Sequence, residues 1–256
     1  MKKPLILVTN DDGIYAPGIY SLKKALEGAG DLYVVAPLVE KSAVGHAITL
    51  SDPLRVTEIE RDNGFFGYAV NGTPADCVKL GCKCILPRKP DLVISGINQG
   101  PNTATNVIYS GTVSAAAEAA IMGIPAIAVS IASFTRQEFA FAARFSRKLA
   151  GLVLERGLPE RTVLNVNVPA VPEEEIEEIV ITRQGKGRYE EAFDKRIDPN
   201  NRVYYWLTGK RMILDNGNDV DDLVVMQNKV SITPIQYDLT NYSFLEELKK
   251  WNIKMD

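Results

Sequence analysis

Two adjacent aspartates follow a short apolar stretch near the start of the chain. Residues 5–9 are apolar or β-branched, and Asn10, Asp11, Asp12 and Gly13 come directly after them. Such a run predicts a strand of a parallel sheet, and α/β proteins bind ligands beyond the carboxyl ends of these strands. Gly13 allows a turn that brings both carboxylates together, where they repel each other unless a cation or a proton lies between them. The stretch therefore predicts either a cation site or a simple turn that caps the next helix.

Oxygen-bearing side chains follow two later strands of the predicted sheet. Ser42 lies in a polar loop after the second strand, and Asn98 lies in a loop rich in asparagine and threonine after a later one. By itself, Ser42 is more typical of a solvated loop. Together with Asp11 and Asp12, these residues offer oxygen ligands without His or Cys, which favours Mg²⁺ or Mn²⁺ over zinc.

Ser110, Gly111 and Thr112 precede an alanine-rich segment that predicts a helix over 115–122. Free N–H groups and the helix dipole favour an anion at such an N-terminus. Ser110 as a plain N-cap is the alternative, and the two roles are compatible. A phosphate held here would share the cation, so the combination predicts metal-assisted phosphoryl hydrolysis with Asp11 or Asp12 as the base.

Other phosphatase and hydrolase templates match poorly. His46 is the single histidine, and neither R-H-G nor G-x-S-x-G occurs, which argues against histidine-phosphatase and triad chemistry. A peripheral substrate contact and a structural role remain the two alternatives for His46. Cys82 and Arg88 match the C-x5-R spacing of cysteine phosphatases, but the intervening residues include a proline and no glycine, so they suit a cradle of N–H donors poorly. We expect Cys77, Cys82 and Cys84 to be reduced thiols.

These residues need a scaffold that brings strand ends together. The pattern predicts a helix over 14–30 that begins near Pro17, then a strand over 32–36, and this unit indicates the right-handed crossover of a Rossmann-like fold. The first turn lacks G-x-G-x-x-G, which argues against a dinucleotide site. We predict a Rossmann-like three-layer α/β core with a mostly parallel sheet over residues 1–170. Its further strands are expected over 48–50, 55–59, 68–70, 92–96, 126–129 and 163–168, and its further helices over 74–83, 115–122 and 135–156.

The composition changes after Pro169. Alternating and charged segments with Gly and Asn turns over 179–232 predict β-hairpin material outside the core, and 243–250 predict a terminal helix. We therefore predict an arm over 171–256, a hairpin with a C-terminal helix, that is not an independent domain. Because the hairpin and the helix have few other elements of the same chain to pack against, we expect an oligomer in which subunits exchange these arms.

The overall composition narrows the range of partners. The 256 residues carry a formal net charge of −3, and the pI is near 5.4. An acidic chain is a poor match for nucleic-acid polymers and for anionic membranes. With no run of about 18 apolar residues in the sequence, we expect a soluble cytoplasmic protein.

Several motifs in order resemble the SurE family of 5'/3'-nucleotidases. The likeness rests on Thr9-Asn10-Asp11-Asp12-Gly13, Asn71-Gly72-Thr73-Pro74-Ala75-Asp76, Ser95-Gly96-Ile97-Asn98-Gln99-Gly100 and Tyr109-Ser110-Gly111-Thr112. It extends to residues 198–206 and 230–234, so it covers almost the whole chain. One departure is Asn200-Asn201, where the family often has Arg-Gly, which leaves the role of that turn open.

The resemblance implies a hydrolase of nucleoside 5'- and 3'-monophosphates, with short polyphosphate as a further candidate substrate. It implies one Mg²⁺ or Mn²⁺ per subunit and a homodimer or tetramer formed through a swapped C-terminal arm. By this likeness the metal ligands are Asp11, Asp12, Ser42 and Asn98, and the phosphate pocket is lined by Asn10, Gly45, Asn102, Ser110, Gly111 and Thr112. The alternative class is a non-catalytic nucleotide-binding protein that uses the same pocket.

Overall fold

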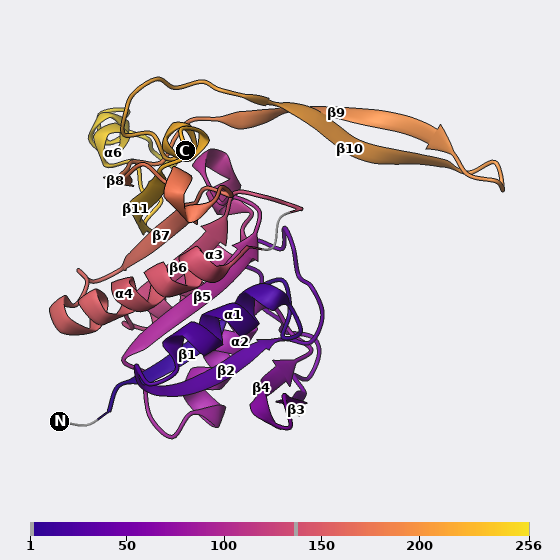
Figure 1. Cartoon of the computed structure of the whole chain (residues 1–256). Coiled ribbons are helices and arrows are strands. Elements are labelled where there is room, and N and C mark those ends of the chain that lie inside the picture. The colour runs from indigo at the N-terminus through magenta and orange to yellow at the C-terminus, as the bar shows by residue number, and fades with distance from the viewer. Residues whose placement is uncertain (1–2, 136–137, 256) are drawn as a thin grey trace.

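The computed structural model describes residues 3–135 and 138–255 and shows a sheet of nine strands (Figure 1). Their order is β3-β4-β2-β1-β5-β6-β7-β11-β8. The pairs from β4 through β2, β1, β5 and β6 to β7 are parallel, while β3 and β11 run antiparallel to β4 and β7. The strands are β1 (Leu5–Thr9), β2 (Asp31–Pro37), β3 (Val56–Arg61), β4 (Gly64–Val70), β5 (Leu92–Gln99), β6 (Ala126–Ile131), β7 (Thr162–Val168), β8 (Ile179–Ile181) and β11 (Val230–Gln236).

Helices cover both faces of this sheet, which confirms the predicted three-layer α/β core (Figure 1). Helices α1 (Pro17–Leu26) and α4 (Ala140–Arg156) lie on one face, and α2 (Pro74–Leu80) and α3 (Gly111–Ile121) lie on the other. Alternate residues of β1 enter different clusters, with Ile6 facing α1 and α4 and Leu7 facing α2 and α3. A strand buried on both faces has to be apolar throughout, which explains the unbroken run at the start of the chain.

Local hydrogen bonds fix the start of α2 where the sequence predicts it. The Thr73 hydroxyl accepts the N–H of Asp76, and the Asp76 carboxylate accepts the N–H of Thr73. This capping box satisfies N–H groups that have no partner within the helix, and Pro74 occupies the first helical position. The chain continues as a π-helical turn over Gly81–Ile85.

The C-terminal part of the chain includes a long hairpin that leaves the body of the protein (Figure 1). Strands β9 (Arg188–Ile197) and β10 (Val203–Met212) pair antiparallel with each other along their whole length. Almost every side chain of the two strands is exposed. The predicted terminal helix is α6 (Tyr242–Lys249), and a short helix, α5 (Asp221–Met226), precedes β11.

Several predicted boundaries are wrong. Residues 48–50 form no strand, because the Thr49 N–H and hydroxyl bond to the Asp76 carboxylate instead of to a neighbouring strand. Strand β5 continues to Gln99, through residues predicted as loop. Helix α4 begins at Ala140 rather than 135, and residues 136–137 of the predicted helix lie outside the described residues. Strands β8 and β11 join the central sheet, so only β9 and β10 of the segment 179–232 leave the core as strands.

The described helices include none that is long and apolar enough to cross a bilayer. Cys77, Cys82 and Cys84 are free in the structure. Burial raises the pKa of Cys77 and raises that of Cys82 to about 11, so both stay protonated at neutral pH. A protonated Cys82 is a poor nucleophile, in keeping with the rejected C-x5-R motif.

Candidate active site at the carboxyl end of the sheet

Asp11 lies between the end of β1 and the first turn of α3. It is 4 % exposed, and its carboxylate accepts a hydrogen bond from the Thr112 hydroxyl. A side chain at Gly111 would place its Cβ 2.7 Å from the Cβ of Asp11 and 2.9 Å from its Oδ2. Glycine at this position therefore lets the N-terminus of α3 approach the carboxylate. Burial raises the pKa of Asp11.

Asp12 lies beside Asp11 and faces the end of β5. Its Oδ2 accepts the N–H of Gln99 at 3.1 Å. Burial and the charge of Asp11 raise the pKa of Asp12 to about 7. Two neighbouring carboxyl groups with raised pKa values favour a bound proton or cation between them.

The two other predicted metal ligands lie on segments that adjoin this pair. Asn98 precedes Gln99, and its Nδ2 donates to the carbonyl of Gly100 at 2.7 Å, which leaves Oδ1 as the atom that it would offer to a cation. The loop that holds Ser42 is tied to Asp11, because the Lys41 N–H donates to the Asp11 carbonyl at 2.8 Å. Ser42 itself is exposed and donates to Glu40 Oε1 at 2.6 Å.

The donor atoms fit a hard cation. Among residues 3–135 and 138–255, no three His, Cys, Asp or Glu side chains form a group that could hold a metal ion. A cation here would depend on the two carboxylates together with the hydroxyl of Ser42 and the amide oxygen of Asn98. Such an all-oxygen set suits Mg²⁺ or Mn²⁺ and is unlike the nitrogen and sulfur sets of zinc sites.

The residues predicted to line a phosphate pocket have different surroundings. Ser110 is the N-cap of α3, with its hydroxyl accepting the N–H of Val113 at 3.0 Å. Asn10 donates through Nδ2 to the carbonyl of Gly13 at 2.9 Å, while its buried Oδ1 has no hydrogen-bond partner within residues 3–135 and 138–255. Gly45 donates its N–H to the carbonyl of Tyr109 at 3.0 Å, which holds its loop beside the start of α3.

Asn102 is anchored by a buried network on β6 and β7 that the sequence did not indicate. Its Nδ2 donates to the Ser130 hydroxyl at 2.8 Å. Its backbone N–H donates to Asn167, and its carbonyl accepts from Asn165 and Asn167. The one feature of the sequence that could have indicated this network is the pair of alternate asparagines, Asn165 and Asn167, near the end of the predicted strand 163–168.

His46 is paired with a buried glutamate of α3. Its Nε2 lies 2.9 Å from Glu118 Oε2, and the Lys79 ammonium lies 2.6 Å from Glu118 Oε1. Burial opposes the charge on Glu118, but the hydrogen bonds from His46 and Lys79 outweigh it and hold the Glu118 pKa below its usual value. The lone charge in an alanine-rich helix was the signal for Glu118 in the sequence. The pair joins the loop that follows Gly45 to the middle of α3.

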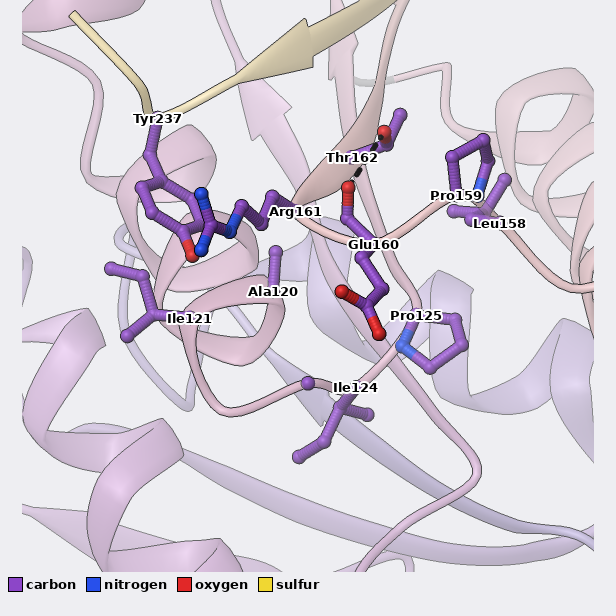
Figure 2. Close-up of a pocket in the computed structure, with 11 residues that line it drawn as sticks. Ala120, Ile121, Ile124, Pro125, Leu158, Pro159, Glu160, Arg161, Thr162 and Tyr237 are labelled. Carbon is purple, nitrogen blue, oxygen red and sulfur yellow. Dashed lines mark hydrogen bonds between the residues drawn. The ribbon is translucent and has the colours of Figure 1, made fainter.

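Two sizeable pockets lie at opposite ends of the parallel strands. One, of about 460 Å³, is lined by Asp12 and Ser42 and so adjoins the carboxylate pair. The other, of about 400 Å³, lies at the amino ends of β6 and β7, where Figure 2 shows Tyr237, Arg161 and Glu160 among the residues around it. Because ligands of α/β sheets bind at the carboxyl edge, the first pocket belongs to the candidate site.

Comparisons with known proteins give one consistent result. The family model described as "Survival protein SurE" matches residues 6–191. A protein of Chlorobium phaeobacteroides named 5'-nucleotidase SurE is 48 % identical over 254 residues, which cover 99 % of this chain and 98 % of the relative. One of Syntrophobacter fumaroxidans with the same name is 50 % identical over 248 residues, covering 97 % and 99 %. The crystal structure of the SurE protein from Aquifex aeolicus matches with a TM-score of 0.85 and 43 % identity, over 98 % of this chain and 100 % of that one.

Proposed function

The chain belongs to the SurE family, and on that basis we propose that it is a nucleotidase that hydrolyses nucleoside monophosphates with the help of a divalent cation. The observation that carries the proposal is the carboxylate pair of Asp11, which is buried, and Asp12, which is half-buried, beside the first turn of α3. The carboxylates would hold a cation, and the helix N-terminus would hold the phosphate. The helix N-terminus could not hold a phosphate beside Asp11 and Asp12 without the cation, since two carboxylates repel a phosphate unless a cation screens their charge.

The residues of the chain have separate roles in this mechanism. Asp11, Asp12, Ser42 and Asn98 would hold the cation. When bound, the cation supplies positive charge that polarises the phosphate and acidifies the attacking water. The N–H of Gly111 lies in the first turn of α3, where it has no acceptor within the helix, and it would bind a phosphate oxygen. The hydroxyl and the backbone N–H of Thr112 both hydrogen-bond to the Asp11 carboxylate and would hold it in place.

The proton of the attacking water goes to one of the two aspartates. A base works best when its pKa lies near the working pH. Thr112 holds the Asp11 carboxylate in one orientation, and the Gln99 N–H does the same for Asp12. Both carboxylates are therefore positioned before the substrate arrives.

The proposal extends to substrates, cation and assembly. We propose that both 5'- and 3'-monophosphates are substrates, with short polyphosphate as a further one, and that each subunit binds one Mg²⁺ or Mn²⁺ in the cytoplasm. The arm formed by β9 and β10 supports a homodimer or tetramer built by arm exchange, because the hairpin extends away from the rest of the chain (Figure 1) and its exposed side chains include Phe193, Tyr205 and Trp206.

The test is phosphate release from AMP and 3'-AMP by chelator-treated protein, with Mg²⁺ or Mn²⁺ added back. We expect activity to return only with a cation, and Asp11→Asn to lose about a hundredfold or more in kcat. Mn²⁺ binding, followed by calorimetry, is expected to weaken in the same variant. Asp52→Asn, which alters an exposed aspartate, is the matched control.

Two results would contradict the proposal. A folded wild-type protein that releases no phosphate with either cation cannot be a nucleotidase of this kind. Tight binding of AMP without any cation would instead favour the non-catalytic binding protein.

A further inference from the structure

The pocket beside the carboxylate pair is lined by both polar and apolar residues. Its volume of about 460 Å³ lies within the range of about 300–1000 Å³ that is usual for small-molecule sites. The polar part of the lining comes from Asp12, Glu40, Ser42 and Gln99. The apolar part of the lining comes from the start of α1, at Ala16 and Pro17, and from Phe134 and Phe139 near the start of α4. This mixed lining suits a ligand that has both a phosphate and a flat apolar group.

Phe134 is the unusual residue of this lining. It is 72 % exposed, although large aromatic side chains are normally buried on one side or more. Its position is nonetheless fixed, because Gln99 Nε2 donates to its carbonyl at 2.6 Å. The ring also packs against Gly100, where a Cβ would lie 2.5 Å from the ring Cε1. A ring that is held against a glycine and open to solvent is a ready surface for another ring to stack on.

We propose that this pocket binds the nucleoside part of the substrate and that Phe134 stacks on its base. The inference rests on the proposed nucleotidase function and adds the residue that separates nucleotides from smaller phosphate esters. Asp12 belongs to both sites, so a phosphate held beside it leaves the rest of the molecule in the pocket. Stacking of a base on an aromatic side chain is worth about 1–3 kcal/mol, which corresponds to about 5- to 150-fold in binding.

The experiment compares AMP with ribose 5-phosphate, which carries the same phosphate and sugar without the base. For Phe134→Ala we expect the ratio of kcat/KM for AMP to kcat/KM for ribose 5-phosphate to fall at least about fivefold, mainly through the KM for AMP. Phe134→Tyr keeps a ring and is expected to keep the ratio. Phe65→Ala removes another exposed ring, on β4, and serves as the control.

Binding of adenosine, measured by calorimetry on the same proteins, tests the pocket without turnover. We expect wild type and Phe134→Tyr to bind adenosine and Phe134→Ala to bind it at least about fivefold more weakly. An unchanged ratio in Phe134→Ala, or equal adenosine binding by all variants, would overturn the stacking role. A wild type that binds adenosine through Phe134 but hydrolyses neither ester would contradict only the nucleotidase function, so the two failures are distinguishable.

Discussion

Asp12→Asn should stabilise the cation-free protein, by an amount that grows with pH. Burial and the charge of Asp11 raise the pKa of Asp12 from its ordinary value of 3.8 to about 7. Between those pH values the Asp12 carboxyl is ionised in the unfolded chain and protonated in the folded one. Its ionisation therefore lowers the free energy of unfolding more and more as the pH rises to 7, and by a constant amount at higher pH. The linkage relation gives a cost of about 2 kcal/mol at pH 5 and about 4 kcal/mol at pH 8. Asparagine removes this cost and keeps an oxygen that accepts the Gln99 N–H.

The assay is urea unfolding of the chelator-treated protein at pH 5 and pH 8, at one protein concentration. We expect Asp12→Asn to exceed wild type in free energy of unfolding at both pH values, with a difference about 2–3 kcal/mol larger at pH 8. Asp52→Asn, at an exposed position, is expected to follow wild type. A gain that is equal at the two pH values, or a loss of stability at pH 8, would refute the reasoning. Adding Mn²⁺ should reverse the order, because the cation stabilises only the protein that binds it well.

Two further substitutions test the surroundings of the carboxylate pair. Gly111→Ala places a Cβ 2.7 Å from that of Asp11, so we expect kcat with Mn²⁺ to fall about tenfold or more, whereas Gly151→Ala, which meets nothing within 4 Å, should keep wild-type activity. Wild-type kcat in Gly111→Ala would contradict the close approach of α3 to the carboxylate. Glu118→Gln removes the buried charge that pairs with Lys79, so urea unfolding should show a loss of about 1–2 kcal/mol at pH 7. The pKa of Glu118 is lowered in the folded state, so this loss should disappear as the pH falls below it, and a loss that persists there would contradict the ion pair.

The secondary-structure elements that are predicted best from the sequence are those fixed by interactions between residues close together in the chain. Helix α2 begins at the predicted position because Thr73, Pro74 and Asp76 complete a capping box without help from the rest of the chain. Elements that depend on distant partners are less predictable. Residues 48–50 alternate like a strand, but their neighbour is Asp76 rather than another strand. The sequence of β11 resembles that of the neighbouring hairpin strands, but β11 pairs with β7 and β8 and so belongs to the central sheet.

The same distinction applies to the candidate site. Asp11, Asp12 and Asn98 were predicted as site residues because each follows a strand predicted from the sequence, and the carboxyl ends of parallel strands meet on one side of the sheet. For Glu118 the sequence shows only a lone charge in an alanine-rich helix, and nothing in the sequence distinguishes Phe134 from other apolar residues. Glu118 matters because His46 and Lys79 lie next to it in space, far from it in sequence. Phe134 is distinguished by its exposure and by its contact with Gly100, and only the folded chain shows either.

The order of strands in the sheet has a consequence for how the protein is made. Strand β11 lies between β7 and β8, although the whole β9–β10 hairpin precedes it in the chain. Until the ribosome has released residues 230–236, the antiparallel partner of β7 is missing and that strand remains an open edge. The growing chain therefore exposes this edge strand and a hairpin with many apolar side chains, while the first seven strands of the sheet, β1 to β7, are already able to pair. The nine-stranded sheet is complete only when β11 has paired with both β7 and β8.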